Sequence, residues 1–326
     1  MPTTSQHLGG FGPALVLPGE VLAGKYKVER VLGAGGWGVV LAARNLQLGQ
    51  RVAIKLLAQE KTPGTQARLL REARAVARIQ SDHVVQVYDV GCTDSDTPYI
   101  VMEYLEGQDL AALLQRSSAV PVPLAIHWVL QACAGLAAAH RHGIVHRDLK
   151  PANLFLERRS DGSSRLKLLD FGIAKVPDAT GLTEAGGFMG SPAYMAPEQL
   201  LDARDVDGRT DVWGLGVVLY ELLSKERPFA AEAPFALLTQ VREQPHASLR
   251  SRSEDVPEAL SQAVDRCLAK SRQDRWQSVA ELARALAPFA PAPARELIGH
   301  VERLAGGGAD QLTLGPDVVL ASRPTP

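Results

Sequence analysis

Between residues 26 and 104, short apolar segments alternate with turns that contain glycine, asparagine or aspartate. Short apolar runs rich in valine, isoleucine and tyrosine are typical of β-strands. Such runs occur at residues 26–32, 39–43, 51–57, 84–90 and 99–104. Because the first three follow one another with short connections, we expect them to form an antiparallel meander.

Helical periodicity appears first within this region and then dominates the rest of the chain. Residues 65–80 carry apolar side chains on one helical face, which predicts an amphipathic helix before the fourth strand. After Gly107 the same type of pattern predicts helices at residues 109–115, 124–142, 210–223, 234–242, 258–269 and 278–286. The intervening stretch, residues 143–209, is long and irregular, and such loops inside a compact domain are usually functional.

The two ends of the chain lack a clear apolar period. Residues 1–24 are interpreted as a flexible N-terminal segment, and residues 25–290 as the folded domain. Residues 291–326 are interpreted as a C-terminal tail of unknown structure with a short helix at 295–304.

Composition indicates an ordinary globular protein, because 46% of the residues are hydrophobic and the net charge is −1. This charge gives no general attraction to nucleic acid, and the apolar run 212–223 is short and interrupted by Glu221, so no membrane span is expected. The N-terminus lacks the pattern of a secretory signal. Three scattered cysteines favour a reduced, cytoplasmic protein without disulfides or zinc. His127, His140 and His142 have no nearby carboxylate or thiol that would complete a metal site, so structural roles are favoured.

A glycine-rich segment, Gly33 to Val40, lies between the first two predicted strands. Glycine lets the backbone approach a phosphate closely, although such spacing alone is weak evidence. A dinucleotide site would require a helix after the glycines, whereas here a strand follows and a third strand ends near Lys55. Lys55 either extends to solvent or pairs with Glu72 on the 65–80 helix, and neighbouring arginines on that helix offer Glu72 another partner.

Two acidic loops follow in the irregular stretch. The first contains Asp148, Lys150 and Asn153, and the second contains Asp170 before Phe171 and Gly172. Carboxylate and amide oxygens suit Mg²⁺, which completes its coordination with phosphate oxygens. A single such aspartate is more often a turn residue, but both loops in this order favour a shared site.

Together these motifs resemble the protein kinase family over residues 26–289, and Ala196-Pro197-Glu198, Asp211 and Arg275 extend the resemblance. The resemblance implies an α+β, bilobal protein kinase fold. Its small lobe, about residues 25–102, would hold a five-stranded antiparallel sheet and helix C. Its large lobe, about residues 107–290, would be mainly α-helical. It also implies that Arg275 pairs with Glu198.

The resemblance also implies the roles of individual residues. Lys55, positioned by Glu72, would hold phosphates, Asp148 would accept the substrate hydroxyl hydrogen bond, and Lys150 would neutralise the moving phosphoryl group. Asn153 and Asp170 would bind the metal, Mg²⁺ or alternatively Mn²⁺. The implied ATP-binding set is Leu32, Gly33, Ala34, Gly35, Gly36, Trp37, Gly38, Val40, Ala53, Lys55, Met102, Glu103, Leu105, Asp109, Asn153 and Asp170.

By resemblance the acceptors are Ser and Thr hydroxyls of proteins, because Lys150 follows Asp148 by two positions, as in serine/threonine kinases. The sequence of residues 146–156 is similar to that of bacterial eukaryote-like kinases, several of which continue into a membrane span and a sensor domain. The chain is therefore interpreted as either a soluble member of this group or a fragment of a longer protein. Thr180 and Thr183 are candidate regulatory phosphorylation sites, because a phosphothreonine would supply a counter-charge for Arg147, and a dimer that phosphorylates itself in trans is a candidate partner. The alternatives are an ATP-binding pseudokinase and a small-molecule phosphotransferase. The Ala196–Glu198 segment and Ser191 argue against the second alternative.

Overall fold

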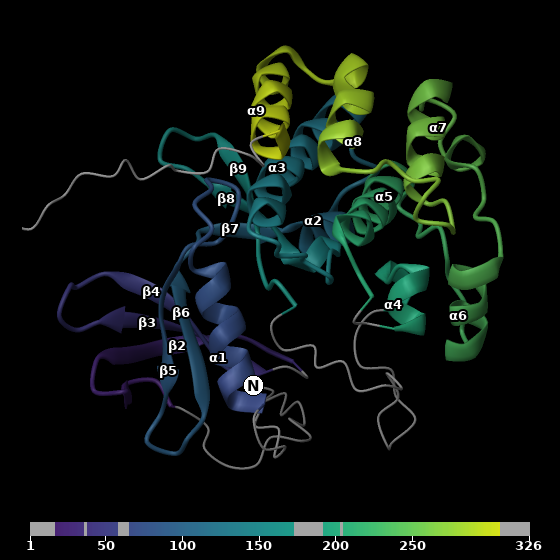
Figure 1. Cartoon of the computed structure of the whole chain (residues 1–326). Helices are drawn as coiled ribbons and strands as arrows, with labels where there is room; N and C mark the ends of the chain where they lie inside the picture. The colour runs from purple at the N-terminus through teal and green to yellow at the C-terminus, as the bar shows by residue number, and fades with distance from the viewer. Residues whose placement is uncertain (1–16, 36–37, 58–64, 173–191, 203–204, 307–326) are drawn as a thin grey trace, which may run out of the picture.

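The computed structural model describes residues 17–35, 38–57, 65–172, 192–202 and 205–306. A β-sheet with one helix beside it forms the first part, and the rest is mainly helical (Figure 1). The sheet has the strand order β1-β2-β3-β4-β6-β5. Its strands are β1 (Val21–Leu22), β2 (Tyr26–Gly35), β3 (Gly38–Asn45), β4 (Arg51–Leu57), β5 (Val87–Cys92) and β6 (Pro98–Glu103), all paired antiparallel.

The two faces of this sheet have different surroundings. Leu41, Ile54 and Val101 are buried in a small cluster on one face, which also includes Tyr26. The other face turns toward helix α1 (Thr65–Val76), whose Leu69, Ala73 and Val76 join the main core. Because side chains alternate along a strand, residues such as Lys55 lie on this second face.

The large lobe combines a small antiparallel sheet with helices. Its sheet contains β7 (Gly107–Asp109), β8 (Leu154–Arg158) and β9 (Ser164–Leu168). Its helices are α2 (Leu110–Arg116), α3 (Val122–Arg141), α4 (Pro197–Leu201), α5 (Gly208–Ser224), α6 (Pro234–Glu243), α7 (Glu258–Cys267), α8 (Val279–Leu286) and α9 (Arg295–Gly306), and short 3₁₀ turns include η1 (Pro151–Asn153) and η2 (Pro192–Tyr194).

Helices α3 and α5 are the centre of the large lobe, since most residues of both helices are buried. Helix α3 is long and apolar enough to cross a membrane by length and composition, but 78% of its most apolar segment is buried inside the protein. Its apolar surface is therefore used by packing, with α5, α8 and α9 as neighbours (Figure 1).

The α+β bilobal fold expected from the sequence is confirmed, with differences in its details. The small-lobe sheet has a sixth strand, because Val21 and Leu22 pair with β2 before residue 25. The irregular stretch 143–209 contains the β8–β9 hairpin and α4, which are too short to give a clear periodic pattern. The short helix expected near residue 295 is α9, which buries Val301 against the large lobe. The domain boundaries stay a prediction.

Candidate active site

Lys55 and Asp170 come from different lobes and meet at the centre of the candidate site. Lys55 is near the end of β4, and Asp170 follows β9 by two residues. The Lys55 Nζ lies 2.7 Å from the Asp170 Oδ1, and the lysine side chain is only 12% exposed. Asp170 has a left-handed backbone, with φ of +50°, which marks a sharp turn directly after the strand. This pair establishes that the two motifs share one site.

Glu72 was expected to position Lys55. It lies on α1 and is half-buried. The structure pairs Lys55 with Asp170. The pairing of Lys55 with Glu72 therefore stays a prediction.

Asp148, Lys150 and Asn153 form a hydrogen-bonded group in the loop after α3. Lys150 Nζ lies 3.0 Å from Asp148 Oδ2. Asn153 Nδ2 donates to the same oxygen at 3.0 Å and to the Asp148 carbonyl at 2.7 Å. This orientation of the amide leaves its oxygen as the atom of Asn153 that could bind a cation.

Asp211 on α5 holds the backbone of this loop. It is 1% exposed and accepts hydrogen bonds from the His146 and Arg147 amides at 2.9 Å and 3.0 Å. His140 Nε2 lies 2.7 Å from its Oδ2. Burial would raise the pKa of Asp211, but the hydrogen bond and charge of His140 and the amides outweigh burial and lower it. The carboxylate therefore stays ionised and fixes Arg147, which has a φ of +65°.

The loop that carries Asp148 and the loop that carries Asp170 are also joined to each other. His146 Nε2 lies 2.8 Å from the Leu169 carbonyl, and the Gly172 amide donates to the His146 carbonyl at 2.9 Å. The buried Phe171 ring packs on the His146 ring at 4.6 Å between centroids. Burial lowers the pKa of His146, so its neutral form is favoured. A displacement of Asp170 would therefore be transmitted to Asp148 through these contacts.

The expected ATP-binding residues of the strands share one face of the small-lobe sheet. Val40 pairs with Lys55 across β3 and β4, and Ala53 pairs with Met102 across β4 and β6. Residues directly opposite each other lie on the same face of a sheet. Gly38 has a φ of +136°, and a Cβ there would lie 1.9 Å from the Leu56 carbonyl oxygen, so no other residue fits.

The structure describes only some of the other residues in the glycine-rich segment. Leu32, Gly33, Ala34 and Gly35 form the end of β2 and are exposed. Gly36 and Trp37 lie outside the described residues.

The segment joining the lobes begins at Glu103 and is anchored by side chains. Glu103 Oε1 lies 2.6 Å from Lys167 Nζ of β9 and accepts the Gln86 amide at 2.7 Å. Asp109 caps α2, because its Oδ1 accepts the Ala112 amide at 2.8 Å. The Glu103 anchor gave no signal in the sequence because Lys167 is 64 positions away, whereas the Asp109 cap was detectable from the local pattern of an aspartate directly before a helix. The expected adenine and ribose contacts of Glu103, Leu105 and Asp109 stay predictions.

The donor set is compatible with Mg²⁺. Asp170 supplies a carboxylate and Asn153 an amide oxygen, which are hard ligands of the type that Mg²⁺ prefers. Within the described ranges, no group of three or more His, Cys, Asp or Glu side chains could hold a metal by itself. Two protein ligands with phosphates and water completing the shell are the usual arrangement for a nucleotide-bound magnesium.

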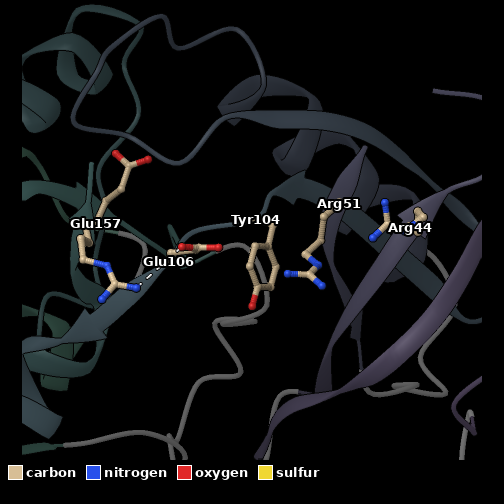
Figure 2. A pocket seen from close by; sticks show the side chains of 6 residues that line it. Arg44, Arg51, Tyr104, Glu106 and Glu157 are labelled. Atoms are coloured by element: carbon tan, nitrogen blue, oxygen red, sulfur yellow. Dashed lines mark ion pairs between the residues drawn. The ribbon is translucent and has the colours of Figure 1, made fainter. Parts of the chain in front are cut away.

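A polar pocket lies beside the segment that joins the lobes (Figure 2). It measures about 460 Å³ and is lined by Arg44, Arg51, Tyr104, Glu106, Glu157 and Arg158. Several of its side chains already have partners: the Arg51 guanidinium lies 5.1 Å from the Tyr104 ring centre and 2.8 Å from Glu29, and Arg158 lies 3.8 Å from Glu106. None of the lining residues belongs to the expected ATP-binding set.

Glu198 and Arg275 form the pair expected from the sequence. Two guanidinium nitrogens of the fully buried Arg275 each lie 2.8 Å from a Glu198 oxygen. Burial would raise the pKa of Glu198, but the Arg275 guanidinium outweighs burial and lowers it. The pair fastens α4 to the segment before α8.

The candidate regulatory residues Thr180 and Thr183 lie outside the described residues, as does Ser191. Arg147 Nε is buried and has no hydrogen-bond partner in the described part of the chain.

Comparison with known proteins is consistent with this geometry. The family described as protein kinase domain matches residues 26–286. The chain is 41% identical over 269 residues to serine/threonine-protein kinase Pkn1 of Myxococcus xanthus, covering 82% of this chain and 38% of that protein. It is 37% identical over 269 residues to serine/threonine-protein kinase PknB of Mycolicibacterium smegmatis, covering 80% and 42%. The chain thus spans about two-fifths of the length of these relatives.

Among solved structures, the Mycobacterium tuberculosis PknI kinase domain matches with a TM-score of 0.67 and 28% identity, covering 84% of this chain and 100% of that one. The match to the family extends over both lobes and includes every described residue of the candidate site. The chain belongs to the protein kinase family.

Proposed function

We propose that this chain is a serine/threonine protein kinase that transfers the γ-phosphoryl group of ATP to protein hydroxyls. The observation that carries the proposal is the contact between Lys55 and Asp170, since it joins the two lobes at one point. The names of Pkn1 and PknB support the same activity. They also support Ser and Thr as acceptors.

The described side chains suit this reaction because it depends mainly on positioning and on charge. The Lys55 ammonium would bind phosphate oxygens once ATP displaces or shares its contact with Asp170. The Asp148 carboxylate, oriented at Oδ2 by Lys150 and Asn153, would accept the hydrogen bond of the substrate hydroxyl. Lys150 would then lie close to the transferred phosphoryl group. When bound, Mg²⁺ neutralises phosphate charge, and Asn153 and Asp170 would hold it.

We extend the proposal to the protein partner of the chain and to its location in the cell. A second copy of the chain is a natural substrate for phosphorylation in trans, and Thr180 and Thr183 are its candidate acceptors. A cytoplasmic location is supported by Cys92, Cys133 and Cys267, which are all free thiols.

Transfer of radiolabel from ATP to a generic basic protein tests the activity. We expect transfer by the wild type, on serine and threonine, and a fall of about 100-fold or more in Asp148→Asn, because one positioned polar group commonly contributes that much. Binding of ATP without transfer would instead indicate a pseudokinase. Transfer to sugars or antibiotics but not to protein would indicate a small-molecule phosphotransferase.

A further inference from the structure

Gln131 on α3 holds the outer edge of strand β9 at Leu166, while the backbone of His83 and Val85 holds the same edge at Leu168. It is a polar residue with only 4% exposure in the middle of a buried helix. Its Oε1 accepts a hydrogen bond from the Leu166 amide at 2.7 Å. The Leu166 carbonyl lies 3.0 Å from His83 Nδ1, so side chains satisfy both backbone groups of this residue. The opposite edge of β9 pairs with β8.

These contacts fix the direction of the Gln131 amide and the proton position of His127. A backbone amide can only donate, so the Gln131 atom that faces Leu166 must be the oxygen. The Gln131 nitrogen then faces His127 Nε2, at 2.7 Å, and donates to it. His127 Nε2 must therefore be an unprotonated acceptor, and the proton of the neutral ring lies on Nδ1. That Nδ1 is buried and has no hydrogen-bond partner among the described residues.

A second proton on His127 is incompatible with this arrangement. Protonation would place an N–H group of the ring against the NH₂ group of Gln131. The amide would have to rotate to present its oxygen to His127, and its nitrogen would then face the Leu166 amide, which also donates. Leu166 would lose its acceptor in a buried position, which is costly because water cannot replace it.

Strand β9 leads directly to the candidate metal site. Asp170 follows Leu168 by two residues, and the Leu169 amide donates to the Asn153 carbonyl at 2.9 Å. We propose that His127 and Gln131 form a proton-sensitive relay in which neutral His127 keeps Gln131 on the Leu166 amide, and that acidification frees this part of β9 and weakens the support of Asp170. Gln131 is thus a positioning residue. The contacts of His127 and Gln131 do not depend on the proposed function, whereas the effect on phosphoryl transfer rests on it.

The surroundings of the relay favour the neutral form of His127. Burial lowers the pKa of His127 from 6.5. Near Leu166, Arg165 is paired with Asp82 at 3.0 Å, Lys167 is paired with Glu103, and burial lowers the pKa of His83 as well. The unfolded chain binds the His127 proton more readily than the folded protein does. The contribution of neutral His127 to the free energy of unfolding is therefore complete above about pH 6.5. It is lost as the pH falls toward the lower pKa that His127 has in the folded protein.

Nuclear magnetic resonance of the imidazole nitrogens tests the relay without any enzymatic activity. In the wild type we expect the neutral ring to carry its proton on Nδ1. In Gln131→Glu the carboxylate can still accept from Leu166 but favours protonated His127, so the pKa of His127 should rise above 6.5. In Gln131→Leu, exchange protection of the Leu166 amide should fall about tenfold. A wild-type proton on Nε2, or an unchanged pKa in Gln131→Glu, would overturn the relay.

Phosphoryl transfer measured from pH 5.5 to 8 tests its consequence. Relative to the wild type, His127→Gln should lose less activity on acidification, because its amide can accept from Gln131 but cannot titrate. His142→Gln, at the exposed end of the same helix, is the matched control and should follow the wild type. Identical pH profiles for all three proteins would contradict the link to Asp170. An inactive wild type would count against the proposed function and not against the relay, which the resonance data decide separately.

Discussion

The ion pair between Lys167 and Glu103 illustrates how single residues support the site from outside it. The side chains are 8% and 16% exposed, and they connect β9 of the large lobe to the end of β6 in the small lobe. Glu103 also accepts the Gln86 amide, so one carboxylate holds three segments together. Breaking a buried pair at one end leaves the other charge without compensation, which costs more than the pair contributes.

We therefore expect Lys167→Met to lower the free energy of unfolding by about 3–5 kcal/mol. The double variant Lys167→Met with Glu103→Gln should recover most of that loss, because glutamine keeps an acceptor for the Gln86 amide without a charge. Urea unfolding of the two variants and the wild type measures both effects. Equal losses in the single and double variants would argue against an uncompensated charge as the cause.

Sequence analysis identified the residues of the site that belong to compact motifs, and missed those that act across the fold. Lys55, Asp148, Asn153 and Asp170 were expected together, and the structure brings them together. Gln131 and Lys167 gave no signal because their partners are 35 and 64 positions away. A buried polar side chain is recognised only when its surroundings are known.

At the scale of elements, periodicity predicted the longer helices and strands well. Strand β4 occupies the expected residues, and α3 and α5 differ from the expected ranges by a few positions at their ends. The β8–β9 hairpin was missed because two five-residue strands in a loop region offer too few alternations. Strand β1 has only two residues and depends on its pairing with β2.

Helix α9 lies beyond residues 26–286, where the family match ends, yet it packs on the large lobe beside α3 and α8. Val301 is fully buried, and Leu297, Ile298 and Leu304 pack against the core. Arg284 Nε also donates to Glu302 at 2.9 Å. The helix thus covers apolar surface that would otherwise meet water.

A chain ending at Ala290 should consequently be less stable than one ending at Gly306 by about 3 kcal/mol or more, since each fully buried aliphatic side chain contributes about 1.5–3 kcal/mol. Thermal and urea unfolding of the two proteins provide the comparison. Coincident unfolding curves would mean that α9 contributes nothing to the large lobe.

At the scale of the whole molecule, the account depends on convergence between the lobes. Lys55 is contributed by the sheet, while Asp148 and Asn153 lie between α3 and β8, and Asp170 follows β9. Buried Asp211 supports the backbone before Asp148, and the hydrogen bonds of His146 and Leu169 link the two large-lobe loops. This convergence is what the proposed phosphoryl transfer from ATP depends on.

Mass spectrometry of the purified chain after incubation with MgATP tests this claim most directly, with wild type and Lys55→Met compared. We expect phosphate on serine or threonine residues of the wild type, and none on Lys55→Met, because the variant keeps the fold but loses the charge that holds the phosphates. Equal phosphorylation of both proteins, or a folded wild type that acquires no phosphate on itself or on added protein, would contradict the account.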